Sequence, residues 1–135
     1  TRVEPSVARA KNYRKVSWDQ LRTIAADELF VVGGHSLDHS ILSKLGHEDM
    51  EENIDSSIGL LERNLEGAVR HYSYPEGGRE HYSPAVIRHL KKRGIVASPS
   101  AIPGLNSIGD DLFHLTRIMV GFMNAAFPYF DSQLR

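Results

Sequence analysis

The sequence predicts an α/β fold in a single domain. Three observations support this prediction: helical patterns alternate with short apolar runs, the first run ends in paired glycines, and the helices have recognisable start and stop residues. With 135 residues, of which 41% are hydrophobic, the chain is long enough for one core. Residues 1–135 are therefore predicted to form one domain, with residues 1–16 as a poorly defined polar and basic arm.

The first helix is predicted to begin just after Ser17. Ser17 and Gln20 have the spacing of a capping box, in which each side chain bonds the other residue's backbone N–H. We expect the helix to end near Asp27. Its predicted inward face consists of four apolar residues: Trp18, Leu21, Ile24 and Ala25.

A short buried strand is predicted directly after this helix, at residues 29–32. Four apolar residues in a row, two of them β-branched, are typical of a strand in a parallel sheet. Gly33 and Gly34 then let the backbone turn where a side chain would clash. A helix followed so closely by a strand is the repeating unit of α/β folds.

A longer amphipathic helix is predicted over residues 50–65. Five apolar residues recur there at intervals of three and four: Met50, Ile54, Ile58, Leu61 and Leu65. We expect Gly67 to end this helix. A second strand should follow at residues 68–74 and end in the turn sequence YPEGG.

A third helix is predicted between Ser83, as N-cap, and Gly94. A strand at residues 95–97 and a last strand at residues 112–120 should follow, separated by a loop rich in Pro, Gly and Ser. The aromatic residues of segment 122–130 are expected to pack against the body of the domain. The alternation describes part of a parallel sheet or barrel with one functional rim.

Composition excludes several functional classes. Sixteen basic and seventeen acidic residues leave a net charge of −1, which gives no electrostatic footprint for a nucleic acid. No segment is apolar over the length needed to cross a membrane. The absence of cysteine excludes disulfides, thiol catalysis and Cys-based zinc sites, and it leaves the cellular compartment open.

Two histidines directly follow the first predicted strand. His35 and His39 lie where α/β proteins display functional side chains, just past the carboxyl end of a strand. If the loop winds into a helical turn, their spacing of four places both imidazoles on one face. The pattern predicts a zinc-type metal site, and the alternative is a surface loop whose histidines have no role.

From about Trp18 to Val120 the sequence resembles the polysaccharide deacetylases, the NodB-homology or carbohydrate esterase family four domains. The segments that carry the resemblance are GGHSLDH, HYSYPEGG, SPAVIRHLKKRGIVASPSAIPGLN and FHLTRIMV. The resemblance implies a partial, distorted (β/α) barrel of the seven-stranded NodB-homology type. It also implies removal of N- or O-acetyl groups from an acetylated oligosaccharide or polysaccharide by means of a bound divalent metal, usually zinc.

The most specific part of the resemblance is GGHSLDH. It matches the family motif H-[S/T]-x-x-H, so that His35 and His39 correspond to metal ligands. Ser36 corresponds to the hydroxyl residue that stabilises the loop by hydrogen bonding. Asp38 could complete the metal shell, although its position between the two histidines favours an outward orientation.

A second stretch resembles the motif R-x-P-Y-G, which builds one wall of the sugar groove in this family. The resemblance places four residues at this wall: Tyr74, Pro75, Glu76 and Gly77. The sequence departs from the motif at two positions, since Ser73 replaces the arginine and Glu76 replaces the tyrosine.

Two further family motifs are missing. T-F-D-D, which supplies the general-base aspartate and the third metal ligand, does not occur in the sequence. The L-x-H motif of the general acid is not recognisable, because His114 lies in a different register. We therefore expect a C-terminal portion of a deacetylase domain with unknown catalytic residues and an open sheet edge that promotes self-association. The alternative is a non-catalytic deacetylase-like domain that binds a glycan or a protein partner.

Overall fold

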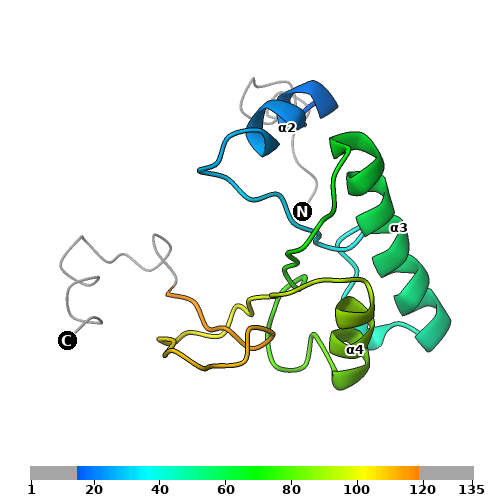
Figure 1. The fold of residues 1–135 in the computed structure, drawn as a ribbon. Helices are drawn as coiled ribbons and strands as arrows, with labels where there is room; N and C mark the ends of the chain where they lie inside the picture. Colours follow the sequence, from blue (N-terminus) through cyan, green and yellow to red (C-terminus); the bar gives the residue numbers. More distant parts are fainter. Residues whose placement is uncertain (1–14, 119–135) are drawn as a thin grey trace, which may run out of the picture.

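The structure, a computed structural model, describes residues 15–118. The helices of this part are α2 (Trp18–Ala25), the 3-10 helix η2 (Leu42–Lys44), α3 (His47–Leu65) and α4 (Pro84–Lys92). Figure 1 shows α4 beside the lower half of α3 and α2 near the opposite end of α3. No helix in this part combines the length and apolar character that a membrane span requires. Most of the predicted arm and all of segment 122–130 lie outside the described residues.

Extended segments pair in parallel beside the helices, but through isolated bridges and not through regular strands. The bridges join Gly34 to Tyr72, His71 to Ala97, and Pro103 to Arg117. The first two bridges each join segments that are separated by an α-helix, as in successive β/α units. No helix lies between Pro103 and Arg117. The strands predicted at 29–32, 68–74, 95–97 and 112–120 are not formed as continuous elements in the described residues, because each pairing extends over too few backbone hydrogen bonds.

α3 provides the centre of the core. Met50, Ile54 and Ile58 are between 0% and 3% exposed, which confirms the first three positions of the predicted apolar face. They belong to the same buried cluster as Val86 and Leu90 of α4. Leu61 and Leu65, the last two positions of the predicted face, are only partly buried. The predicted stop at Gly67 is wrong by one residue. The left-handed residue that ends α3 is Glu66, with φ 54° and ψ 35°.

α4 begins and ends as predicted. The Ser83 hydroxyl accepts a hydrogen bond from the Val86 N–H at 3.4 Å, and Pro84 occupies the first turn. Gly94 has φ 82°, a conformation that favours glycine just past a helix end. These caps fix both ends of the helix that carries the buried Val86 and Leu90.

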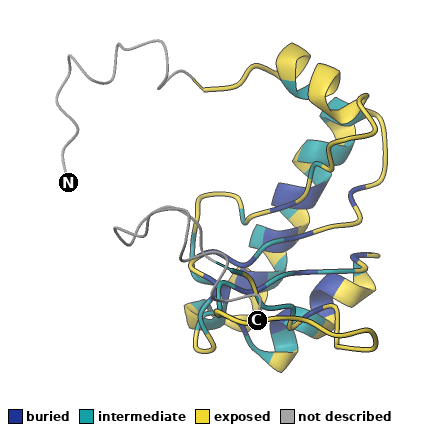
Figure 2. Ribbon diagram, turned by 90° about the vertical axis from the view of Figure 1, so that its left-hand side faces the viewer, coloured by how far each residue is buried: buried dark blue, intermediate teal, exposed yellow. Residues whose placement is uncertain are grey.

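α2 forms with the predicted capping box, but its predicted burial is wrong. None of its residues is buried, and Trp18 is 38% exposed. The predicted buried strand at 29–32 is also corrected, since Leu29, Phe30 and Val31 are 83%, 55% and 69% exposed. Figure 2 shows this exposure along α2 and the segment after it. The physical reason is that no described segment covers this apolar surface.

Candidate metal centre

Gly33 and Gly34 bring the histidine loop close to the neighbouring segment. The Gly34 N–H donates to the His71 carbonyl at 2.9 Å, and the Ser73 N–H donates to the Gly34 carbonyl at 2.8 Å. A Cβ on Gly34 would lie 2.5 Å from Cδ2 of Tyr72, and one on Gly33 would lie 2.8 Å from the His71 oxygen. Only glycine permits this approach, which confirms that a side chain would clash here.

The two predicted metal ligands lie together at the end of this pairing. The ring centroids of His35 and His39 are 4.9 Å apart at an interplanar angle of 68°, and both residues are exposed. His35 Nδ1 lies 2.8 Å from the Ser73 carbonyl oxygen. Because a carbonyl only accepts hydrogen bonds, this contact places the proton on Nδ1 and leaves the lone pair of Nε2 available.

The loop that carries these histidines has an uncommon backbone. Ser36 and His39 have φ values of 58° and 65°, in the left-handed region that non-glycine residues rarely adopt. The Ser36 N–H donates to the Tyr72 hydroxyl at 2.7 Å. The Ser36 hydroxyl itself is buried with no hydrogen-bond partner among residues 15–118. The contact that supports the loop here therefore comes from the backbone of Ser36, and the role of its hydroxyl stays a prediction.

α3 supports the same loop from the other side through Asn53. Its side chain accepts from the Leu37 N–H at 3.0 Å and donates to Asp38 Oδ1 at 3.0 Å. Hydrogen bonds from Ser40 and then Asn53 lower the pKa of the Asp38 carboxyl below its ordinary value of 3.8. The Asp38 carboxylate thus stabilises the loop through these hydrogen bonds. Asn53 was not among the predicted site residues, because in the sequence it is only a polar residue next to the apolar face of α3.

The predicted groove segment is mostly buried. Tyr74 is 1% exposed and stacks on Tyr82, with centroids 4.1 Å apart and planes at 9°. Its hydroxyl donates to the Phe113 carbonyl at 3.0 Å, and burial raises the pKa of Tyr74. Pro75 and Gly77 are also buried, whereas Glu76 is exposed with φ 60°. A contact between these four residues and a sugar stays a prediction.

The donor set fits only part of a metal site. The imidazole pair offers two nitrogen ligands, and the orientation of His35 is the one found in zinc sites. In the part of the chain that the structure describes, no group of three His, Cys, Asp or Glu residues could hold a metal ion. A third protein ligand is therefore not provided by residues 15–118.

The chain belongs to the polysaccharide deacetylase family, because the family model described as "Polysaccharide deacetylase" matches residues 6–97, more than half of the sequence. The match includes His35, His39 and the Tyr74–Gly77 turn. A comparison with curated proteins gives no match.

Solved structures of deacetylases share the fold. A de-N-acetylase from Aggregatibacter actinomycetemcomitans is 16% identical, with a TM-score of 0.72 over 89% of this chain and 53% of that chain. A polysaccharide deacetylase from Bacillus cereus is 20% identical, with a TM-score of 0.72 over 89% and 37%. IcaB from Ammonifex degensii is 21% identical, with a TM-score of 0.67 over 83% and 51%. The chain thus spans about half, or less, of these structures.

Proposed function

We propose that this chain supplies two metal ligands to the active site of a polysaccharide deacetylase. The proposed reaction removes acetyl groups from an N- or O-acetylated oligosaccharide or polysaccharide. The observation that supports it best is the pairing of His35 with His39, with the Ser73 carbonyl fixing the His35 tautomer. Residues 1–135 would form a single domain of a partial (β/α) barrel.

His35 and His39 would hold a divalent cation, most simply zinc. Such a cation polarises an acetyl carbonyl and lowers the pKa of a bound water. The chain's own residues position the ligands: Ser73 orients His35, while Asn53 and Asp38 hold the loop. The third ligand and the general base would come from residues outside the described part.

The segment Tyr74, Pro75, Glu76 and Gly77 would form one wall of the sugar groove. Burial of Tyr74 and Pro75 makes the backbone of this turn rigid, so that Glu76 is presented outward. An exposed carboxylate at this position can accept hydrogen bonds from sugar hydroxyls.

A titration with zinc or cobalt tests the metal site. We expect the unmodified chain to bind the metal, and His35→Ala and His39→Ala each to lose binding. His47→Ala is the matched control, since His47 lies on α3 with a side chain 72% exposed. Binding should be weaker at about pH 5 than at about pH 8, because protonated imidazole cannot ligate. Metal binding that is retained by both His35→Ala and His39→Ala would contradict the proposal.

The alternative function is a non-catalytic deacetylase-like domain that binds a glycan or a protein partner. The observation that favours it is the altered groove motif, in which Ser73 and Glu76 replace the arginine and the tyrosine of R-x-P-Y-G. Acetate release from an acetylated oligosaccharide, measured on the longest protein that the gene encodes, separates the two functions. Release that depends on His35 supports the enzyme, and glycan binding without release supports the alternative.

We also propose self-association through the exposed apolar segment 29–31. This segment borders a cavity of about 300 Å³ that Phe30, Val31 and Val69 help to line. Pairing of two such edges would cover apolar surface and unpaired backbone groups. Sedimentation at tens of micromolar should show a dimer or larger species that Phe30→Asp disrupts. Leu105→Asp is the control, since Leu105 is 64% exposed elsewhere, and a strictly monomeric chain contradicts the proposal.

A further inference from the structure

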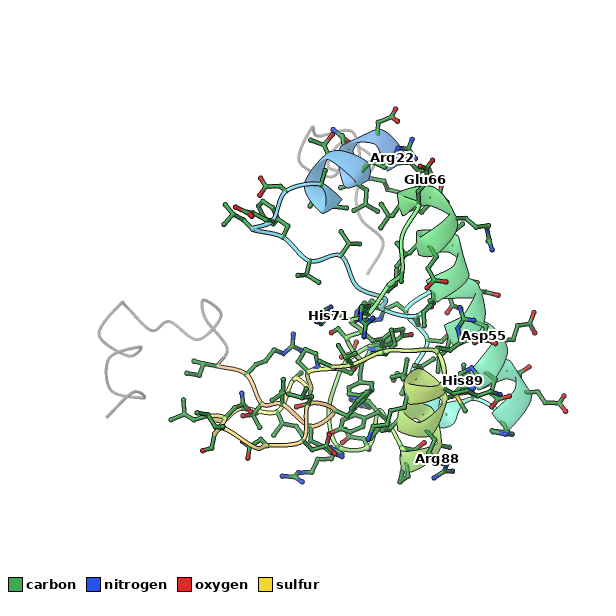
Figure 3. The ribbon with its side chains drawn as sticks, viewed as in Figure 1. Arg22, Asp55, Glu66, His71, Arg88 and His89 are labelled. Atoms are coloured by element: carbon green, nitrogen blue, oxygen red, sulfur yellow. The ribbon has the colours of Figure 1, made fainter. Side chains whose placement is uncertain are left out.

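A second cavity lies at the start of α4, and none of the predicted site residues lines it. Its volume is about 400 Å³, within the usual range for small-molecule sites. Its polar lining includes Arg79, Arg88, Asp111 and His114. Tyr82 and Ile87 contribute apolar surface. Arg88 is the middle residue of α4, and Figure 3 shows it below His89 on this helix.

Positive charge dominates this cavity. Neither Arg79 nor Arg88 forms an ion pair with a carboxylate among the described residues. The carboxylate next to Arg79 in sequence, Glu80, faces His81 Nε2 at 3.0 Å instead. Asp111 is the one carboxylate among the lining residues, and its Oδ1 accepts the Phe113 N–H at 2.9 Å. Two guanidinium groups are thus available to a ligand.

The remaining lining is fixed by aromatic packing. The Tyr82 ring stacks on the buried Tyr74, and its hydroxyl lies 3.2 Å from His114 Nδ1. His114 is in turn 3.8 Å from Asp111 through Nε2. These contacts fix the polar groups of Tyr82, His114 and Asp111, and Ile87 also lines the cavity. The cavity therefore offers both an apolar surface and hydrogen-bonding groups to a ring.

We propose that this cavity binds a sugar that carries an anionic group, either a carboxylate or a phosphate, through Arg79 and Arg88. The planar guanidinium group matches both anions with two parallel hydrogen bonds. The sugar part of this inference rests on the proposed deacetylase function. The anionic part rests on the two arginines alone. An acidic saccharide unit held here would add selectivity for a charged polymer.

Isothermal titration of the full chain with four small probes tests the inference: glucuronate, glucose 6-phosphate, glucose and inorganic phosphate. We expect glucuronate or glucose 6-phosphate to bind more tightly than glucose, and the stronger of the two identifies the anion. Arg79→Gln and Arg88→Gln should each weaken that binding by about tenfold or more. Arg63→Gln, an exposed arginine on α3, is the control and should leave it unchanged. Added salt should weaken the interaction.

Four outcomes would overturn the inference. Equal binding of glucose and the acidic sugars would show that charge does not contribute to the affinity. Absence of binding by every probe would show that the cavity is not a binding site for these ligands. If inorganic phosphate binds as tightly as glucose 6-phosphate, the sugar does not contribute to binding. Unchanged affinity in both arginine variants would show that Arg79 and Arg88 do not bind the anion.

The zinc titration separates this inference from the proposed function. Arg79→Gln and Arg88→Gln should retain zinc binding, which also shows that they are folded. Loss of acidic-sugar binding with zinc binding intact places the effect in the cavity. If zinc fails to bind while the acidic sugar binds, the metal proposal fails and the anion site stands.

Discussion

The backbone N–H of Ser36 donates a hydrogen bond of 2.7 Å to the hydroxyl of Tyr72, which fastens the candidate metal loop to the next parallel segment. Tyr72 is 2% exposed, and burial raises the pKa of its hydroxyl, so the group remains neutral at physiological pH. The loop geometry is therefore tied to the core.

Replacing Tyr72 with Phe should loosen this loop. The change leaves the Ser36 N–H without its partner, which should lower the free energy of unfolding by about 1–3 kcal/mol. Urea denaturation measures this loss, and zinc titration should show weaker binding as the loop becomes mobile. Tyr82→Phe is the control for zinc binding, because Tyr82 contacts His114 and not the loop. Equal zinc affinity in both variants would show that the Ser36 contact does not position the ligands.

Gly34→Ala should destabilise the protein by overpacking. The new Cβ would meet the Tyr72 ring at 2.5 Å, and the two backbones would have to separate at a cost of about 1–3 kcal/mol. Gly67→Ala is the control, since a Cβ there lies 3.8 Å from its nearest neighbour. Thermal or urea unfolding should show a large loss for Gly34→Ala only. Similar stabilities would indicate that the Gly34 and Tyr72 backbones move apart at little cost.

The Asp38 carboxyl should make stability depend on acid pH. Hydrogen bonds lower the pKa of this carboxyl in the folded state. Its contribution to stability is therefore complete when the pH is above the ordinary pKa of 3.8, and it is lost as the pH falls through the lower pKa of the folded state. Urea midpoints should therefore show wild type more stable than Asp38→Asn at about pH 6, with the gap closing toward about pH 2. The exposed Glu52→Gln controls for removal of one charge. A gap that is constant with pH contradicts the prediction.

His89 should contribute strongly to the contact between α3 and α4. Its side chain is 4% exposed, with Nδ1 2.9 Å from Glu51 and Nε2 2.7 Å from Asp55. Figure 3 shows His89 and Asp55 on neighbouring faces of the two helices. His89→Ala leaves a cavity and breaks both contacts, so we expect a loss of about 2–4 kcal/mol.

His47→Ala is the matched control for His89→Ala. His47 also faces Glu51, at 3.8 Å, but is largely exposed. Its removal should change stability by no more than about 0.5 kcal/mol in the same urea experiment. Comparable effects of the two substitutions would mean that burial of His89 adds nothing to the contact.

Local patterns predicted the helices well. The capping residues Ser17 and Ser83 and the apolar spacing of Met50, Ile54 and Ile58 act over one or two turns, so they can be recognised without knowing the rest of the fold. The resemblance to polysaccharide deacetylases is confirmed by the family match. The predicted metal, groove and loop roles of individual residues remain predictions.

Burial could not be predicted in the same way. Residues 29–32 have the composition of a buried strand, yet burial requires a covering segment that local sequence does not specify. The same limit applies to His89, which appears in the sequence as one more polar residue near a helix end. Its carboxylate partners lie on a helix more than thirty residues earlier in the chain.

The parallel pairings follow the order of the chain: Gly34 with Tyr72, and His71 with Ala97. During translation, the pairing partner of each of these two segments therefore leaves the ribosome one α-helix later. Tyr74 and Tyr82 differ, because their hydroxyl groups contact Phe113 and His114, which follow later in the chain. We expect the histidine loop to acquire its support from Tyr72 and Asn53 before the residues around His114 leave the ribosome. Its geometry would thus be set early in the life of the polypeptide.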